Sequence, residues 1–159
     1  QDFDFQALFH TYYRVEGGNA TQKQVCNVQG LSGYRVYDQI TKENYILQDG
    51  ATIHIDREVD RIITPTNTSS SSASTASPLK LILQTGYETT IEASASIDGV
   101  HVPVSVVVWN PFIEKSKGMI DFDNQEYHDM ICVEPGILTN VPSLKSGQKA
   151  TFQQVISTV

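Results

Sequence analysis

The sequence predicts an all-β protein, an antiparallel β-sandwich with little helix. Apolar and polar residues alternate with a period of two along most of the chain, as expected for strands with one buried face. The alternating segments are short, and turn-forming Gly, Pro, Asn and Asp residues separate them. Ten short segments of this kind and almost no helical periodicity favour two sheets packed face to face.

The first expected strand covers residues 2–15. Successive side chains of a strand point to opposite faces. One face is expected in the core, and it carries Phe3, Phe5, Ala7, Phe9, Thr11, Tyr13 and Val15. The other face is semi-polar, and it carries Asp4, Gln6, Leu8, His10, Tyr12 and Arg14. Because the chain starts at Gln1 without Met and enters a hydrophobic strand at once, we expect it to have been cut from a longer protein.

The remaining strands are expected at residues 24–28, 34–38, 51–56, 58–63, 79–84, 88–95, 103–109, 130–134 and 149–158. The strand at 103–109 is apolar on both faces and is expected in the centre of a sheet. The strand at 130–134 is expected to stop at Pro135 and Gly136. Only residues 112–119 have the character of a helical turn or two.

At 159 residues, with 40% hydrophobic residues, the chain is long enough to bury a core and is expected to form a single domain, residues 1–159. The segment 66–78 is rich in Ser and lacks large side chains, so it is expected to be a flexible loop insertion. A phosphorylated or partner-binding loop is the alternative interpretation of this segment.

The net charge of the chain and its two cysteines indicate which binding partners and which redox compartment to expect. Eleven Lys and Arg against eighteen Asp and Glu give a net charge of -7, without the basic stripe that nucleic-acid binding needs. The sequence shows neither a signal peptide nor a membrane span. The two cysteines, Cys26 and Cys132, have no metal-ligand spacing, so free buried thiols in a reducing, cytoplasmic compartment are expected; a disulfide between them is the alternative.

Two residues are candidates for proton transfer. Glu134 ends a strand, where apolar neighbours would raise its pKa and make it a better base near neutrality; a rim or salt-bridge residue is the alternative. His10 lies on the semi-polar face of the first strand beside Gln, Tyr and Arg. A catalytic His needs a second group within reach, and without one it is a structural residue that bonds a neighbour.

Two further residues are candidates for sugar binding. Asp60 shares a strand face with Glu58 and can accept hydrogen bonds from two sugar hydroxyls, although a solvated charged face is equally consistent with the pattern. Trp109, the only Trp, can stack its ring on the apolar face of a sugar; a position in the core is the alternative. His54, His101 and His128 lack a second ligand at useful spacing, so no metal is assigned.

Five blocks, taken in order, resemble the second half of the hexose-6-phosphate mutarotases, also called glucose-6-phosphate 1-epimerases, of the galactose-mutarotase-like group. They are Ala-Leu-Phe-His-Thr-Tyr-Tyr-Arg-Val at 7–15, Gly-Leu-Ser-Gly at 30–33, Glu-Val-Asp-Arg-Ile at 58–62, Val-Trp-Asn-Pro-Phe-Ile-Glu-Lys at 108–115 and Met-Ile-Cys-Val-Glu-Pro-Gly at 130–136. The resemblance covers nearly the whole chain except the Ser-rich segment.

This resemblance implies the C-terminal portion of a large β-sandwich with a sugar cleft on one sheet. It implies that His10 is the general acid, Glu134 the general base and Asp60 a ligand of the sugar hydroxyls. The resemblance does not decide the role of Trp109, which remains a candidate substrate contact from its residue type. The implied reaction opens and recloses the ring of a hexose 6-phosphate and exchanges its α and β anomers, with no metal, nucleotide or redox cofactor.

The chain also departs from the family. Its members are about twice as long, and their N-terminal half supplies the arginines that hold the phosphate, so the chain is expected to be a remnant of an enzyme or to begin inside one. The missing N-terminal half would then be a partner. A non-catalytic carbohydrate-binding sandwich or an inactive fragment is the alternative function, because one fold hosts many functions. An interaction module without a role in sugar chemistry is a third.

Overall fold

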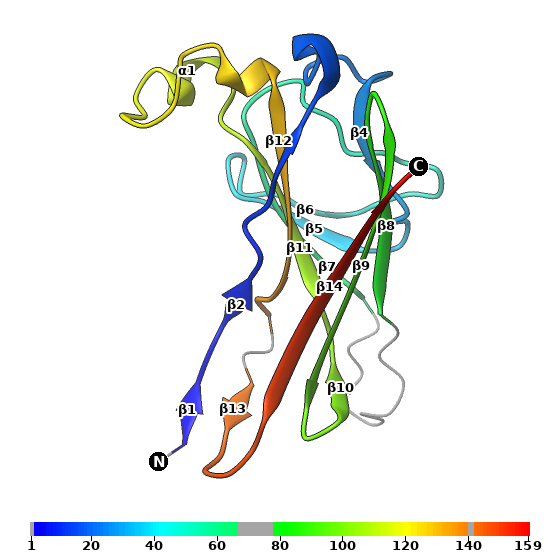
Figure 1. The fold of residues 1–159 in the computed structure, drawn as a ribbon, viewed down its shortest axis with the longest axis vertical. Coiled ribbons are helices and arrows are strands. Elements are labelled where there is room, and N and C mark those ends of the chain that lie inside the picture. Colours follow the sequence, from blue (N-terminus) through cyan, green and yellow to red (C-terminus); the bar gives the residue numbers. More distant parts are fainter. Residues whose placement is uncertain (1, 67–77, 140–141) are drawn as a thin grey trace.

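In a computed structural model of the chain, which describes residues 2–66, 78–139 and 142–159, two antiparallel sheets pack against each other (Figure 1). This confirms the predicted antiparallel sandwich. The larger sheet has the order β2(Ala7–Leu8), β12(Met130–Ile137), β11(Ser105–Asn110), β7(Val59–Thr64), β5(Arg35–Asp38) and β6(Asn44–Ile46), and β3(Tyr12–Arg14) also pairs with β12. The other sheet has the order β10(Val100–Val102), β9(Glu88–Ile97), β8(Leu79–Thr85) and β4(Cys26–Gln29), and β14(Ala150–Thr158) also pairs with β9.

The remaining elements are small. β1(Phe3–Asp4) pairs with β13(Ser143–Leu144) as a separate two-stranded sheet. The helical elements of the described residues are α1(Phe112–Ser116) and two 3-10 turns, η1(Glu16–Gly18) and η2(Glu126–His128). None of these helices is long and apolar enough to cross a membrane. In Figure 1, α1 lies at the end of the larger sheet where β12 begins.

The core lies between the two sheets and is built from the inward faces of their central strands. The larger sheet contributes Val106, Val108 and Val133, and the other sheet contributes Leu81, Leu83 and Ile91, all of them almost fully buried. β11 pairs with β7 on one side and β12 on the other, which confirms the prediction of a central strand at 103–109. The outward face of the larger sheet is therefore free to carry polar groups.

The N-terminal segment differs from the predicted strand 2–15, because it forms three short strands instead of one. β2 and β3 keep one register against β12, since Leu8 lies opposite Gly136 and Tyr12 opposite Cys132. The ladder is interrupted between them, where the Thr11 N–H bonds to the Phe9 carbonyl at 3.1 Å. The predicted core face is also only partly correct. Val15 is buried, whereas Phe3 and Phe9 are 56% and 39% exposed.

Two further expectations on strands are wrong. β12 does not stop at Pro135 and Gly136 but continues to Ile137. The Pro135 carbonyl accepts the Phe9 N–H at 3.0 Å, and Gly136 allows β2 to approach, because a Cβ there would lie 2.7 Å from the Leu8 Cβ. Residues 51–56 form no strand but a single bridge, between Ile53 and Val28 of β4. The strand that pairs with β5 is β6, which was not predicted.

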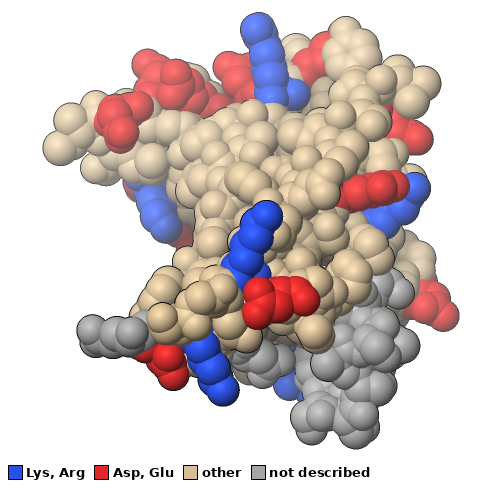
Figure 2. Space-filling view, turned by 60° about the horizontal axis from the view of Figure 1, so that its bottom comes forward, with Lys and Arg blue, Asp and Glu red and all other residues tan. Residues whose placement is uncertain are grey.

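Cys26 and Cys132 are free and buried, which confirms that part of the prediction. The predicted insertion 66–78 lies, apart from its two end residues, outside the described residues. On the face drawn in Figure 2, the Lys and Arg side chains of the described residues lie apart from one another, among acidic and uncharged side chains, and form no basic stripe.

Candidate active site

Strand register brings His10 and Glu134 together. Because Leu8 and Tyr12 lie opposite Gly136 and Cys132 in one register, His10, midway between them, lies opposite Glu134. Side chains of directly opposed residues share a face of the sheet and come within contact distance. The His10 Nε2 and the Glu134 Oε1 are 3.4 Å apart. The structure thus provides the partner that a proton-transferring His10 requires.

The two side chains of this pair differ in burial. The His10 side chain is 49% exposed, whereas the Glu134 side chain is 5% exposed. Burial raises the pKa of Glu134 to about 7, and the nearby Asp60 carboxylate adds to the rise. A carboxylate with this pKa is protonated and deprotonated near neutral pH, which suits a general base.

Asp60 and Trp109 lie on the same face, in the neighbouring row of the sheet. Tyr12 opposes Cys132, Cys132 opposes Trp109, and Trp109 opposes Asp60, so these four residues cross four strands in one line. Trp109 is only partly buried and lies outside the core between the sheets. All four residues named by the sequence analysis, His10, Asp60, Trp109 and Glu134, therefore belong to one surface of the larger sheet.

The neighbours of Asp60 hold it in place. The Gln39 Nε2 donates to the Asp60 Oδ1 at 2.6 Å, and the Gln39 N–H bonds to the Asp60 carbonyl at 2.7 Å. Sequence analysis did not single out Gln39, which lies just after β5 and carries no motif. The carboxylate of Asp60 is thus oriented by a neutral donor, and its remaining lone pairs can accept further hydrogen bonds.

Two aromatic side chains, Tyr12 and Trp109, contact the His10 ring. Its imidazole stacks on Tyr12 with the ring centres 5.0 Å apart, and Trp109 meets both rings edge-on at 6.2 and 6.3 Å. Burial raises the pKa of the Tyr12 hydroxyl, as do the nearby Cys132, Glu134 and Asp121. Tyr12 was predicted only to share the strand face of His10; its alternation with His10 was the signal that could have placed it in the site.

Lys115 supplies a cation at the edge of the site. Its Nζ lies 5.9 Å from the centre of the Trp109 ring and 3.0 Å from the Glu58 Oε1. The side chain is 42% exposed, so it can reach a ligand that rests on Trp109. Lys115 was not predicted as a site residue, because a helical lysine six positions after a Trp has no distinctive spacing.

Asn110 joins the strand that carries Trp109 to the helix that carries Lys115. It is fully buried, and its Nδ2 donates to the carbonyls of Tyr127 and Met130 at 2.9 and 2.8 Å. Its Oδ1 accepts the N–H of Phe112 at 2.8 Å. The middle residue of the Trp-Asn-Pro block therefore has a structural role, because the Asn110 amide joins the end of β11 to the start of β12 and the start of α1.

Arg61, the residue after Asp60, has a structural role on the opposite face of the sheet. Arg61 points to the opposite face of β7, where its Nε lies 3.0 Å from Asp38 Oδ2, and Arg57 Nη2 lies 3.1 Å from the same oxygen. Burial by itself would raise the pKa of Asp38, but hydrogen bonds from the Thr41 N–H, Arg61 and the Ile40 N–H outweigh it and lower the pKa. This ion pair joins β5 to β7 on the face turned away from His10.

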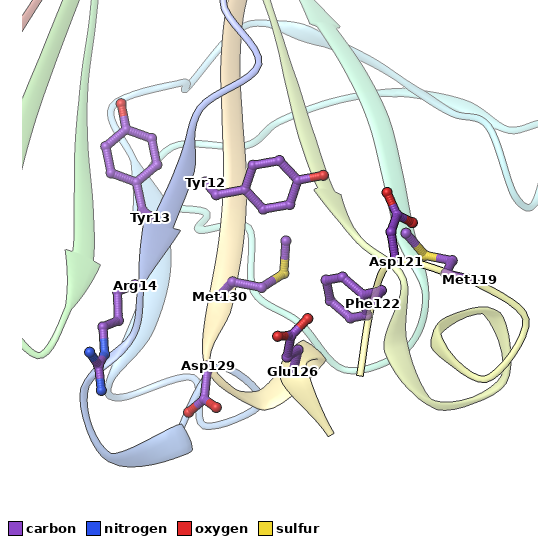
Figure 3. A pocket seen from close by; sticks show the side chains of 9 residues that line it. All are labelled: Tyr12, Tyr13, Arg14, Met119, Asp121, Phe122, Glu126, Asp129 and Met130. Atoms are coloured by element: carbon purple, nitrogen blue, oxygen red, sulfur yellow. The ribbon is translucent and has the colours of Figure 1, made fainter. Parts of the chain in front are cut away.

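A groove of about 550 Å3 adjoins the site and shares Tyr12 with it (Figure 3). Its lining residues are Tyr12, Tyr13, Arg14, Met119, Asp121, Phe122, Glu126, Asp129 and Met130. Figure 3 shows Tyr12 directed toward the loop that carries Met119, Asp121 and Phe122, and Tyr13 directed the other way. The groove includes neither His10 nor Glu134, so it adjoins the acid–base pair without containing it.

The site as a whole is suited to proton transfer on a hydroxylated ligand. It combines a carboxylate of raised pKa, an imidazole 3.4 Å away, a partly exposed indole ring and a second carboxylate on one face. An indole face packs well on the C–H face of a sugar, and carboxylates accept hydrogen bonds from hydroxyls.

Comparison with known proteins gives a consistent result. The sequence profile of the family described as "Aldose 1-epimerase" matches residues 1–157. A protein of Cenchrus ciliaris, described as "Putative glucose-6-phosphate 1-epimerase", is 26% identical over 157 residues, which are 99% of this chain and 42% of that protein.

Two solved structures share the fold. One is a "putative mutarotase (YeaD)" from Salmonella typhimurium, with a TM-score of 0.68 and 21% identity, and the match covers 99% of this chain and 46% of that one. The other is the protein HI1317, with a TM-score of 0.62 and 21% identity, covered over 47% of its length. The chain therefore spans less than half the length of each of these relatives.

Proposed function

The chain belongs to the aldose 1-epimerase family, and on this premise we propose that it carries the acid and the base that interconvert the α and β anomers of an aldohexose. The observation that carries the proposal is the pairing of His10 Nε2 with Glu134 Oε1 at 3.4 Å, on the face that also bears Asp60 and Trp109.

In this mechanism the Glu134 carboxylate takes the proton of the C1 hydroxyl while protonated His10 donates to the ring oxygen. The bond between C1 and the ring oxygen breaks, and C1 becomes the aldehyde carbon. Rotation about the C1–C2 bond presents the other face of the aldehyde. On reclosure, His10 takes the proton from the C5 hydroxyl and Glu134 returns its proton to the C1 oxygen, so the pair ends in its starting state.

The neighbouring residues position the sugar in this proposal. Trp109 supports the apolar face of the ring, and Asp60 accepts hydrogen bonds from hydroxyls remote from C1. The stack of His10 on Tyr12, at 5.0 Å, restrains the imidazole and keeps its Nε2 directed to the reacting side.

We propose a hexose 6-phosphate as the substrate. The description of the Cenchrus ciliaris relative names glucose 6-phosphate, and Lys115 supports the same substrate class in this chain. Its ammonium lies at the edge of the indole on which the sugar would rest, where it can pair with a phosphate by exchanging its contact with Glu58.

The test is magnetisation-exchange NMR between the α and β anomers of glucose 6-phosphate, with unphosphorylated glucose as the comparison substrate. We expect the chain to accelerate exchange of the phosphorylated sugar, and Glu134→Gln and His10→Asn each to lower the rate by about 10²–10⁴. His101→Asn is the matched control, because His101 is an exposed residue of β10 in the other sheet.

A Glu134→Gln variant that exchanges anomers as fast as the parent would contradict the proposed roles. A parent chain that binds the sugar without accelerating exchange, and still binds it after loss of both His10 and Glu134, would instead identify a non-catalytic carbohydrate-binding protein.

A further inference from the structure

A third side chain with a metal-binding atom joins the acid–base pair. Cys132 and Glu134 lie two positions apart on β12, so both side chains project from the same face, toward His10 on the neighbouring segment. The Cys132 Sγ is 3.9 Å from the His10 Nδ1, and the Glu134 Oε1 is 3.4 Å from the His10 Nε2. One ligand atom from each of the three residues can be chosen so that all lie within 4.8 Å of one another.

These three donors match the coordination chemistry of zinc. Zn²⁺ binds imidazole nitrogen, thiolate sulfur and carboxylate oxygen, and sites with three protein ligands keep a fourth position open. Tetrahedral bonds of about 2.0–2.3 Å place neighbouring ligand atoms about 3.3–3.7 Å apart. The nitrogen-to-oxygen separation of 3.4 Å already falls in this range. In a set with one atom per residue no two ligand atoms are more than 4.8 Å apart, so the longest separation would have to shorten by up to about 1 Å on binding.

The surroundings favour a cation. Glu134 is buried, and the Asp60 carboxylate acts on it as a second negative charge. A divalent cation would offset both charges in a region where water screens them poorly. Half of the His10 side chain is exposed, which leaves an entrance from solvent.

We propose that His10, Cys132 and Glu134 form a binding site for a divalent cation of borderline softness, with Zn²⁺ the best fit. On binding, the sulfur–proton bond of Cys132 is exchanged for a sulfur–metal bond and the proton passes to solvent. The bound cation occupies the imidazole lone pair and the carboxylate oxygen. It therefore inhibits proton transfer by these groups, a consequence that rests on the proposed function.

The binding test uses Co²⁺ as a spectroscopic probe in place of Zn²⁺, without any sugar. We expect one Co²⁺ per chain, with an absorption band in the near ultraviolet from sulfur-to-cobalt charge transfer, and displacement of Co²⁺ by Zn²⁺. Cys132→Ser should abolish the band, and His10→Ala should weaken binding by at least about tenfold. Because His10 is exposed, its variant tests the site even where Cys132→Ser disturbs packing.

Cys26→Ser is the matched control, since Cys26 is the other buried thiol and lies in β4 of the opposite sheet. It should keep both the band and the stoichiometry. Absence of Co²⁺ and Zn²⁺ binding to the parent, or a band that survives in Cys132→Ser and disappears in Cys26→Ser, would overturn the proposal.

The inhibitory part is tested separately by the anomer-exchange assay. We expect Zn²⁺ to inhibit the parent and Cys26→Ser equally, to be reversed by a chelator, and to inhibit Cys132→Ser only at a concentration at least about tenfold higher. Equal inhibition of all three proteins would overturn this part. Because the Co²⁺ experiment contains no sugar, a protein without epimerase activity would still confirm or reject the metal site.

Discussion

At the scale of single residues, the pair of His10 and Glu134 depends on unequal environments. The carboxylate is almost completely enclosed and lies near Asp60, whereas the imidazole is half exposed to water. Burial and a like charge both disfavour the ionised carboxylate, which makes it a stronger base once it loses its proton. A site of this kind separates the two roles through the surroundings of each group.

This environment predicts the pH dependence of anomer exchange. Glu134 must be ionised to act as base, so kcat/KM should fall below an apparent pKa of about 7, by tenfold for each further pH unit. Because the Asp60 charge contributes to that pKa, Asp60→Asn should move the acidic limb to lower pH. The measurement is kcat/KM against pH for both proteins; an acidic limb that stays in place in Asp60→Asn would contradict the assigned cause.

Lys115 predicts a difference between substrates. Lys115→Met keeps the apolar stem beside Trp109 but removes the ammonium. We expect KM for glucose 6-phosphate to rise about tenfold, since a partly exposed charge-assisted contact is worth roughly 1.5 kcal/mol, while exchange of unphosphorylated glucose stays unchanged. Steady-state kinetics on both sugars check this.

Lys117→Met is the matched control for that experiment. Lys117 lies two positions further along, and its Nζ is paired with Glu114 at 2.7 Å, away from Trp109. An equal rise of KM in both variants, or for both sugars in Lys115→Met, would show that Lys115 does not contact the phosphate.

At the scale of elements, β12 is the strand on which the site is built. Its alternation puts Cys132 and Glu134 outward and Ile131 and Val133 into the core, and its neighbours β3 and β11 bring Tyr12 and Trp109 to either side. A shift of one residue in the pairing of β3 would turn His10 away from Glu134, because side chains alternate along a strand. Gly136 favours this register, because it has no Cβ that would clash with Leu8 of β2.

Asn110 predicts how the junction of β11, α1 and β12 responds to mutation. Asn110→Ala removes two buried hydrogen bonds to carbonyls and one partly buried bond from the Phe112 N–H, and it leaves these groups without that partner. We expect the free energy of unfolding to fall by about 2–4 kcal/mol. Chemical denaturation measures it, with the exposed Asn44→Ala of β6 expected within about 0.5 kcal/mol of the parent. A loss below 1 kcal/mol in Asn110→Ala would contradict the role of this amide.

At the scale of the whole molecule, burying Glu134 lowers the stability of the folded protein at the pH where this carboxylate is ionised. The folded protein holds Glu134 with a raised pKa, so the folded state binds a proton more tightly than the unfolded chain does. Stability from this group is complete below the ordinary Glu pKa of about 4.3, and it is lost as pH rises to about 7. Above that pH the loss is constant, on the order of 3–4 kcal/mol.

Glu134→Gln should therefore be more stable than the parent at pH 8 and about equal to it at pH 4, although it is inactive in the proposed mechanism. Thermal unfolding of both proteins across this pH range tests the expectation. Glu114→Gln, at a side chain that is 84% exposed, should show no comparable gain. A parent that is more stable than Glu134→Gln at pH 8 would mean that contacts of the ionised carboxylate outweigh its burial.

Much of the sandwich follows from local pattern. Alternation placed most strands within a few residues of their observed ends, and the apolar run before Asn110 correctly predicted a central strand. The pattern failed at residues 51–56, which alternate well but form only the bridge between Ile53 and Val28, whereas residues 44–46 were not predicted as a strand and pair with β5 as β6. Strand formation depends on a pairing partner, which local alternation does not specify. The first strand was predicted as continuous, since nothing local to Phe9 or Thr11 indicates the interruption.

The sequence by itself determined which chemical groups are present, their order and, through the resemblance, which of them to test: His10, Asp60, Trp109 and Glu134. Only the tertiary structure decided that His10 faces Glu134, that Cys132 joins them and that Lys115 reaches Trp109. The reason is physical. A pKa depends on desolvation and on nearby charges, and a metal site on distances between donor atoms. Both are set by residues far apart in the sequence, such as Asp60 and Glu134 or His10 and Cys132, which meet only when the sheets form.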